Sequence, residues 1–96
     1  MAKQIIIGTE RWQFVGETSR EGDQIVITDA FNIRRWGTSE GLGQLALKGP
    51  QPDTLLDDYG TVKIHVLAVV GSLECDSAAP AWIKHDKAVA KKRGAK

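Results

Sequence analysis

Short runs of β-branched and aromatic residues, separated by glycine-containing turns, begin this chain and restrict it to a β-rich fold. Residues 4–8 form a first apolar run, QIIIG. In residues 11–18, RWQFVGET, the side chains of Trp12 and Phe14 are two positions apart and would share one face of a strand. Period-two alternation of this kind is typical of a half-buried β-strand.

A hairpin is expected directly after these two runs. Residues 19–23 read SREGD, in which Gly22 suits a left-handed turn position. Residues 24–36, QIVITDAFNIRRW, form the returning strand, and a bulge near residues 29–30 would change which side chains share a face.

The second half of the chain has a weaker pattern. Residues 37–56 are rich in glycine and proline, and we expect an irregular segment with at most one helical turn. Asp57 and Asp58 are expected to form a turn before Tyr59. Residues 61–74 alternate again and predict either two strands joined at a tight corner or one bent strand.

The C-terminal segment changes to helical spacing. Pro80 suits the first turn of a helix, with Asp76 or Ser77 as the N-cap. We therefore predict a mainly β fold, either a small SH3-like barrel or a strongly bent antiparallel sheet of about five strands. It has a glycine-rich loop insertion and one C-terminal helix. Residues 1–76 would form the β domain and residues 77–96 the helix and basic tail of one single domain.

Length and composition agree with one intracellular globular domain. The 96 residues are 42% hydrophobic and 26% charged, and residues 4–7 are too short an apolar run for a membrane span. We expect a cytoplasmic protein of a bacterial host that does not contact membranes. Its small core favours assembly into a homo-oligomer. The single cysteine, Cys75, excludes an intramolecular disulfide and is expected to be a buried structural thiol.

Charge is distributed unevenly along the chain. Residues 84–96 contain six basic residues and one acid, although the whole chain has a net charge of only +1. The rest of the chain is therefore acidic on balance. Such a tail is typical of a solvated helix end, and weak contact with nucleic acid is the alternative.

We find no pattern that predicts catalysis, a metal or a cofactor. His65 and His85 occur in none of the spacings typical of metal ligands, and no nucleophile elbow or phosphate-binding loop is present. We therefore do not expect an enzyme.

Arg34, Arg35 and Trp36 form the most informative cluster. A structural explanation is a salt bridge to Asp29, Glu40 or Asp57, or stacking against Trp12 or Trp36. A functional explanation is an anion-binding pocket, because arginine grips phosphate in a bidentate manner, tryptophan stacks on planar groups, and glycine lets a backbone approach a ligand. The candidate ligand-binding residues are Asn32, Arg34, Arg35, Trp36, Gly41 and Gly43.

Two blocks carry a resemblance to known proteins. ITDAFNIRRWGTSEGLGQLALKGP, followed by TVKIHVLAVVGSLECD, resembles a family of short phage and prophage proteins of uncharacterised function. The shared pattern falls on Phe14, Gly16, Asp29, Ala30, Asn32, Trp36, Gly41, Gly43, Leu45, Ala46, Gly49, Pro50, Glu74 and Cys75. The basic tail after Asp76 departs from it. A looser resemblance connects the chain to anti-defence sponges of the anti-Thoeris type. Those sponges are oligomers that sequester cyclic nucleotide signals without catalysis.

Three functional hypotheses follow. The first is a non-enzymatic phage-type protein that sequesters an anionic nucleotide-like signal to counter host immunity. The second is a protein–protein inhibitor of a host defence or transcription enzyme, with Trp36 at its binding surface. The third is a nucleic-acid-binding module that uses the basic tail.

Overall fold

The fold is one antiparallel sheet with two helices. The computed structural model describes residues 2–9, 12–39 and 41–94. Its strands are β1 (Ala2–Gly8), β2 (Gln13–Glu21), β3 (Gln24–Arg35), β4 (Leu55–His65) and β5 (Val69–Glu74). The helices are α1 (Leu42–Lys48), the 3-10 helix η2 (Val66–Ala68) and α2 (Pro80–Gly94). The strand order is β4-β3-β2-β1-β5, and every neighbouring pair is antiparallel.

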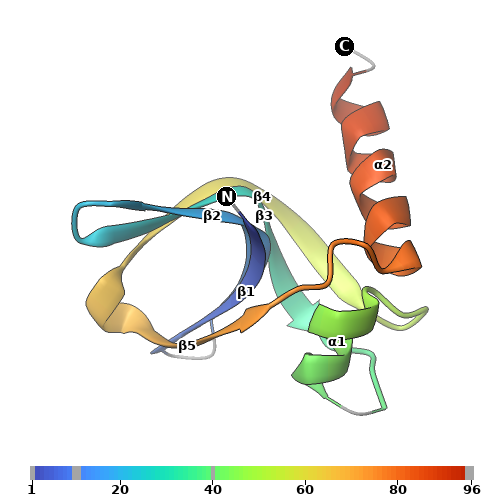
Figure 1. Cartoon of the computed structure of the whole chain (residues 1–96), viewed down its shortest axis with the longest axis horizontal. Helices are drawn as coiled ribbons and strands as arrows, with labels where there is room; N and C mark the ends of the chain where they lie inside the picture. Colours follow the sequence, from blue (N-terminus) through green and yellow to red (C-terminus); the bar gives the residue numbers. More distant parts are fainter. Residues whose placement is uncertain (1, 10–11, 40, 95–96) are drawn as a thin grey trace.

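The mainly β prediction, with five strands and a C-terminal helix, is confirmed. Figure 1 shows the sheet strongly bent, with α1 and α2 beside one end of it. β4 and β5 are the edges of the sheet in its hydrogen-bonded order. Closure into an SH3-like barrel therefore stays a prediction.

A bulge in β3 controls which side chains share a face. Asp29 has a positive φ of 53°, and the pairing of β3 shifts register between Thr28 and Phe31 against β2 and between Ile27 and Ala30 against β4. Aspartate is among the few non-glycine residues that tolerate this conformation. The sequence had left a bulge here open as an alternative, and it had predicted the left-handed Gly22, whose φ is 59°. As a result Ile27 and Phe31, which have the same parity, belong to different hydrophobic clusters.

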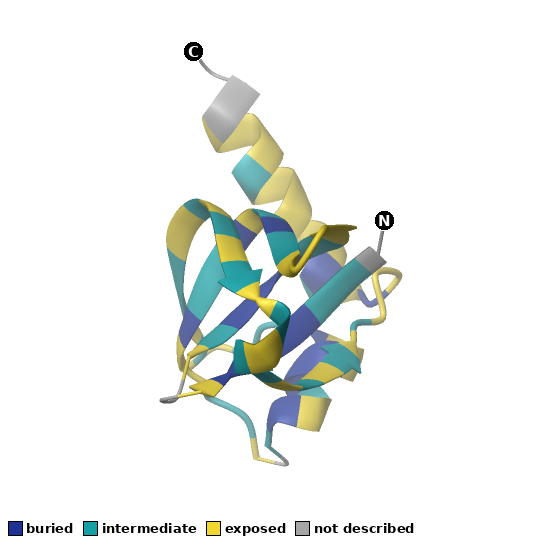
Figure 2. Ribbon diagram, turned by 90° about the vertical axis from the view of Figure 1, so that its left-hand side faces the viewer, coloured by how far each residue is buried: buried dark blue, intermediate teal, exposed yellow. Residues whose placement is uncertain are grey.

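The two faces of the sheet bury separate hydrophobic clusters. One cluster consists of strand residues alone, so this face of the bent sheet packs against itself; its members are Ile6, Phe14, Ile27 and Ala30. The other face is covered by the helices; its members are Ile5, Val15, Ile33, Leu42, Leu45, Ala46, Ala79 and Trp82. Figure 2 shows buried and exposed residues alternating along the strands, as a sheet with two different faces requires.

Two expectations for the second half of the chain were wrong. The segment expected to be irregular contains α1, a seven-residue helix whose buried residues are Leu42, Leu45 and Ala46. Asp57 and Asp58 do not form a turn; they lie within β4 and pair with β3. The turn signal was misleading because Gly60, with a φ of 72°, absorbs a register shift inside the strand, and Asp58 Oδ1 accepts a hydrogen bond from the Gly60 N–H.

The later boundaries agree better with the sequence. Of the two readings of residues 61–74, two strands with a tight corner is the correct one, and η2 forms the corner. His65 Nδ1 accepts a hydrogen bond from the Leu67 N–H and so caps η2. Pro80 is the first residue of α2, as predicted. Asp76 Oδ1 accepts from the Ala78 N–H, in the turn that precedes the helix.

The helix α2 begins in the core and ends in solvent. Trp82 is fully buried, whereas the lysines of the helix are exposed at positions 84, 87, 91 and 92. Among the described residues, no helix is both long enough and apolar enough to cross a membrane.

Candidate functional site

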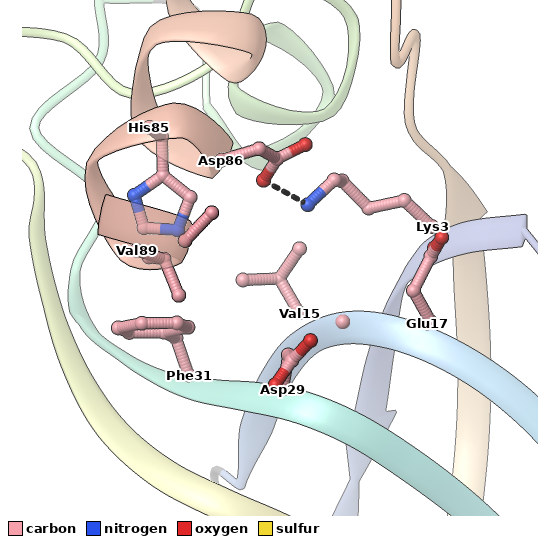
Figure 3. A pocket seen from close by; sticks show the side chains of 10 residues that line it. Lys3, Val15, Glu17, Asp29, Phe31, His85, Asp86 and Val89 are labelled. Carbon is pink, nitrogen blue, oxygen red and sulfur yellow. Dashed lines mark hydrogen bonds and ion pairs between the residues drawn. The ribbon is translucent and has the colours of Figure 1, made fainter. Parts of the chain in front are cut away.

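A cavity of about 260 Å³ lies between the sheet and α2. We call it the α2 pocket (Figure 3). The strands line it with Lys3, Val15, Gly16, Glu17, Asp29 and Phe31, and α2 lines it with His85, Asp86, Val89 and Ala90. Because α2 contributes residues one turn apart, a single helix face forms the upper wall.

One side of the α2 pocket is aromatic and aliphatic. The edge of the His85 ring meets Phe31, with ring centroids 4.8 Å apart and an interplanar angle of 74°. The His85 ring also contacts the ring of buried Trp82, with the two ring centroids 5.6 Å apart. Burial lowers the pKa of His85, the charge of Lys3 lowers it further, and Asp86 opposes both. The imidazole is therefore neutral at neutral pH.

The opposite side of the α2 pocket is charged. Lys3 Nζ lies 2.7 Å from Asp86 Oδ1, and the lysine side chain is only 10% exposed. The same ammonium lies 4.8 Å from the centre of the Trp82 ring. The Lys3–Asp86 ion pair connects β1 to α2, and in it one cation and one anion of the site neutralise each other.

Glu17 supplies an acceptor that the protein leaves unused. Glu17 lies directly across the β1–β2 ladder from Lys3. Its Oε2 atom is buried and has no hydrogen-bond partner among the described residues. A buried carboxylate oxygen without a hydrogen bond is costly.

Arg34 makes one of the salt bridges predicted for it. Its Nε lies 3.0 Å from Asp57 Oδ2, and its second contact joins a terminal nitrogen to Asp57 Oδ1 at 3.1 Å. Asp57 also faces Asn32 across the β3–β4 ladder. Both arginines are exposed, since the strand ends at Arg35 with a register shift that keeps either side chain from the core. Glu40, another predicted partner, lies outside the described residues.

Trp36 lies next to the glycine-rich loop, as the sequence suggested. A Cβ added to Gly41 would come within 3.9 Å of the Trp36 ring. The indole N–H donates to Gln13 Oε1 across 2.7 Å, and Trp36 is 42% exposed. Gly43 is an exposed residue of α1. None of the six predicted ligand-binding residues lines the α2 pocket, so their role in binding stays a prediction.

A second, more open apolar groove lies on the other face of the sheet. Trp12 and Phe14 stack with centroids 5.6 Å apart and 10° between planes, which confirms that they share a face. The Tyr59 ring contacts the Phe14 ring, with the two ring centroids 5.7 Å apart. Val62, Lys63 and Ile64 complete this groove of about 250 Å³, which we call the aromatic groove.

The α2 pocket was missed from the sequence. Its residues come from β1, β2, β3 and α2, and only the docking of α2 on the sheet brings them together. The available signal was weak: His85 and Val89 are four residues apart, as are Asp86 and Ala90, so each pair shares a helix face.

Comparison with known proteins does not assign this site. No protein-family model matches the chain, and a search of curated proteins finds no significant match. Among the described residues, no group of three or more His, Cys, Asp or Glu side chains is arranged to hold a metal ion.

Proposed function

We propose that this protein is a non-enzymatic binding protein that sequesters a small nucleotide-like molecule in the α2 pocket. The observation that carries the proposal is the α2 pocket itself, a cavity of about 260 Å³ with the Phe31 and His85 rings on one side and the Lys3–Asp86 ion pair on the other. Preformed cavities with an apolar wall and a few convergent polar groups are the usual sites of small ligands.

The size and walls of the α2 pocket support a nucleotide-like ligand. Its volume of about 260 Å³ is slightly below the usual range for drug-sized ligands, so it suits part of a nucleotide, such as a base or a sugar. Phe31 offers a planar apolar surface for a ring. Carboxylates such as Glu17 and Asp29 are the groups that accept hydrogen bonds from sugar hydroxyls in dinucleotide-binding folds.

Capture without turnover is supported by what lines the α2 pocket. Among the described residues that line it there is no serine, threonine, tyrosine or cysteine, although His85 and three carboxylates are present, and Lys3 is engaged by Asp86. Nucleophilic catalysis by these residue types requires an activated hydroxyl, thiol or amine. The biological role that we propose is removal of a nucleotide signal of host immunity, and it rests on the looser resemblance of the chain to anti-defence sponges of the anti-Thoeris type.

Binding of defined probes tests the proposal. Cyclic AMP, AMP and the common nucleosides are titrated calorimetrically, and native mass spectrometry of gently purified protein reports any bound small molecule and the oligomeric state. Recovery of each probe unchanged after incubation tests for turnover. Val89→Trp fills the α2 pocket and should abolish binding, whereas Ala88→Trp on the exposed side of the same helix should not. Equal binding by both variants would refute the α2 pocket as the site.

A protein-binding role is the second candidate, and the aromatic groove favours it. Trp12 and Tyr59 are 45% and 46% exposed, although each packs against Phe14. Exposed aromatic residues on a rigid support are typical of interface hot spots. Co-purification of one stoichiometric host protein that is lost in Trp12→Ala and kept in Val89→Trp would favour this role over ligand capture.

A further inference from the structure

Three exposed lysines follow the outer side of α2, at Lys84, Lys87 and Lys91, and we call them the lysine stripe. We infer that the lysine stripe binds the phosphate backbone of double-stranded DNA without reading its sequence. This inference goes beyond the proposed function and does not depend on it, because the stripe and the α2 pocket lie on opposite sides of the helix.

The helical repeat places the three lysines together. At 3.6 residues per turn their positions fall within an arc of about 60°, and they span about 10 Å along the helix axis. Trp82 and Val89 fall on the opposite side, where they meet the core and the α2 pocket. Figures 1 and 2 show α2 projecting beyond the sheet, with exposed residues along most of the projecting part. The lysine stripe is therefore open to a large partner.

The charge of the lysine stripe is not used within the fold. Among the described residues, none of its three lysines forms an ion pair, whereas Lys3 and Lys63 each have an acidic partner. Lysines three and four residues apart on one helix repel each other. The helix macrodipole favours cations in the last turn, but Lys84 and Lys87 lie in the first two turns, where it opposes them. A polyanion would relieve this repulsion.

The acidic balance of the rest of the chain does not prevent such binding. Lys91 lies about 14 Å along the helix axis from buried Trp82, where α2 leaves the core. This separation exceeds the Debye length of about 8 Å at physiological ionic strength. At the far end of the lysine stripe, repulsion between a phosphate and the acidic part of the protein is therefore largely screened.

The surface of α2 favours duplex DNA over other polyanions. Single strands bind on exposed aromatic side chains, but Trp82 is buried and His85 faces the α2 pocket. Anionic membranes require an apolar helix face, and among the described residues of α2 only Ile83 is a large exposed apolar side chain.

Duplex DNA matches the length and width of the lysine stripe. It carries one negative charge per about 1.7 Å of its axis, so about six phosphates fall within the span of the stripe. The major groove of B-DNA, about 12 Å wide, admits an α-helix, whereas that of an RNA duplex is too narrow. Lysine meets phosphate as a point charge, which positions a protein on DNA without specifying a sequence.

Fluorescence anisotropy with a labelled DNA duplex of about 20 base pairs tests the inference, over about 20–200 mM NaCl. The variants are Lys84→Gln, Lys87→Gln, Lys91→Gln and the triple substitution, because glutamine removes the charge and keeps a high helix propensity. The control is Arg20→Gln, which removes the same charge at an exposed position of the β2–β3 hairpin, away from α2 (Figure 1). Circular dichroism confirms the fold of each variant.

The wild type should show a slope of about −2.7 for the logarithm of the binding constant against the logarithm of the salt concentration, the value for three phosphate contacts. Each single variant of the lysine stripe should reduce the size of this slope by about 0.9, and the triple variant should weaken binding at about 50 mM NaCl at least about tenfold. Arg20→Gln should leave the slope unchanged. Equal reductions in Arg20→Gln and Lys87→Gln would overturn the inference, because binding would then follow net charge alone.

Other probes test the choice of duplex DNA. An RNA duplex or a DNA single strand that binds as tightly as the DNA duplex would refute that choice. Poly-L-glutamate that displaces the labelled duplex as well as unlabelled duplex does, at equal concentration of charge, would refute it in favour of an acidic protein partner. Absence of binding by the folded wild type at about 20 mM NaCl would refute the inference altogether.

The proposed function is tested separately. Val89→Trp fills the α2 pocket on the other side of α2 and should leave DNA binding unchanged. Failure of the lysine stripe to bind DNA therefore leaves ligand capture in the α2 pocket standing, and failure of ligand capture leaves DNA binding standing.

Discussion

The indole N–H of Trp82 in α2 donates a hydrogen bond to the carbonyl oxygen of Ala46 in α1, across 3.0 Å in the buried interior. The same carbonyl accepts the Asp76 N–H at 2.9 Å. Carbonyls in the last turn of a helix have no partner within it, and here Asp76, before α2, and Trp82, within α2, each supply a donor. This contact fixes α2 on α1, and it therefore fixes the helical wall of the α2 pocket.

Trp82→Phe should lower the free energy of unfolding by about 2–3 kcal/mol, because it removes a buried hydrogen bond and leaves a cavity. Urea denaturation monitored by far-UV circular dichroism measures the change. The matched control is Trp36→Phe, which removes the hydrogen bond to Gln13 at a 42% exposed position. Trp36→Phe should lower the free energy of unfolding by less than about 1 kcal/mol. Equal losses in the two variants would contradict the role assigned to Trp82.

Replacing two glycines of α1 and its C-terminal cap by alanine should change the stability of the protein in opposite directions. Gly49 has a φ of 87° and a ψ of −178°, and an added Cβ would lie 2.7 Å from the Trp82 backbone nitrogen and 2.8 Å from the Ala81 side chain. Gly49→Ala should therefore destabilise the protein by more than about 2 kcal/mol.

Gly43 lies inside α1, and a Cβ there would meet nothing within 4 Å. Gly43→Ala should stabilise the protein by about 0.5–1 kcal/mol, the gain from removing glycine from a helix interior. Thermal unfolding of both variants beside the wild type provides the comparison. A destabilised Gly43→Ala variant would show that the glycine is needed for the fold.

Residue pattern predicted the parts of the fold that depend on local order. Alternation identified the hairpin of β2 and β3, whereas the bulge near residues 29–30 was an alternative that the alternation left open. Asp57 and Asp58 were misplaced because their turn propensity is local, whereas pairing with β3 is not. Tertiary pairing overrides such propensities routinely.

The site was harder to predict than the fold. Asp57 was only one of three acidic partners that the sequence offered for the arginine pair, because the choice required the register of β3 against β4. The α2 pocket depends on the bulge, which turns Phe31 toward α2, and on the β1–β2 register, which sets Lys3 opposite Glu17. Neither can be read from spacing along one segment.

The two adjacent arginines can be separated by charge-removing variants. Arg34 is held by Asp57, and the pair is largely exposed, so a double-mutant cycle with Arg34→Gln and Asp57→Asn should give a coupling of at most about 1 kcal/mol. Arg35 has no such partner among the described residues. If this block binds an anion, Arg35→Gln should weaken the binding of AMP more than Arg34→Gln does. A larger loss of AMP binding in Arg34→Gln than in Arg35→Gln would show that Arg34 leaves Asp57 to bind the ligand.

Cys75 should be protected from alkylation. Burial raises the pKa of its thiol to about 12; Lys3 opposes this, and Asp86 and Glu17 add to it. Only the thiolate reacts, so iodoacetamide at about pH 8 should modify the native protein about a hundredfold or more slowly than the denatured protein. Mass spectrometry of timed samples follows the reaction. Similar rates in both states would place the thiol in contact with solvent.

Mild acid should destabilise the protein through His85. Burial lowers the pKa of His85 below 6.5 in the native state, so below about pH 6.5 the unfolded chain binds a proton that the native protein does not. The free energy of unfolding should therefore be unaffected by this group at higher pH and fall as the pH drops below about 6.5, until the lowered native pKa is passed.

Urea denaturation at a series of pH values from about 7.5 to about 5 measures this slope. Glutamine at position 85 cannot titrate, so His85→Gln should flatten the plot of the free energy of unfolding against pH in this window. Loss of the ring contact with Phe31 lowers the stability of this variant by the same amount at every pH, so it does not change the slope. Parallel curves for the wild type and His85→Gln would show that His85 takes up its proton equally in both states. The ring would then not be shielded by Phe31 and Trp82 as the structure places it.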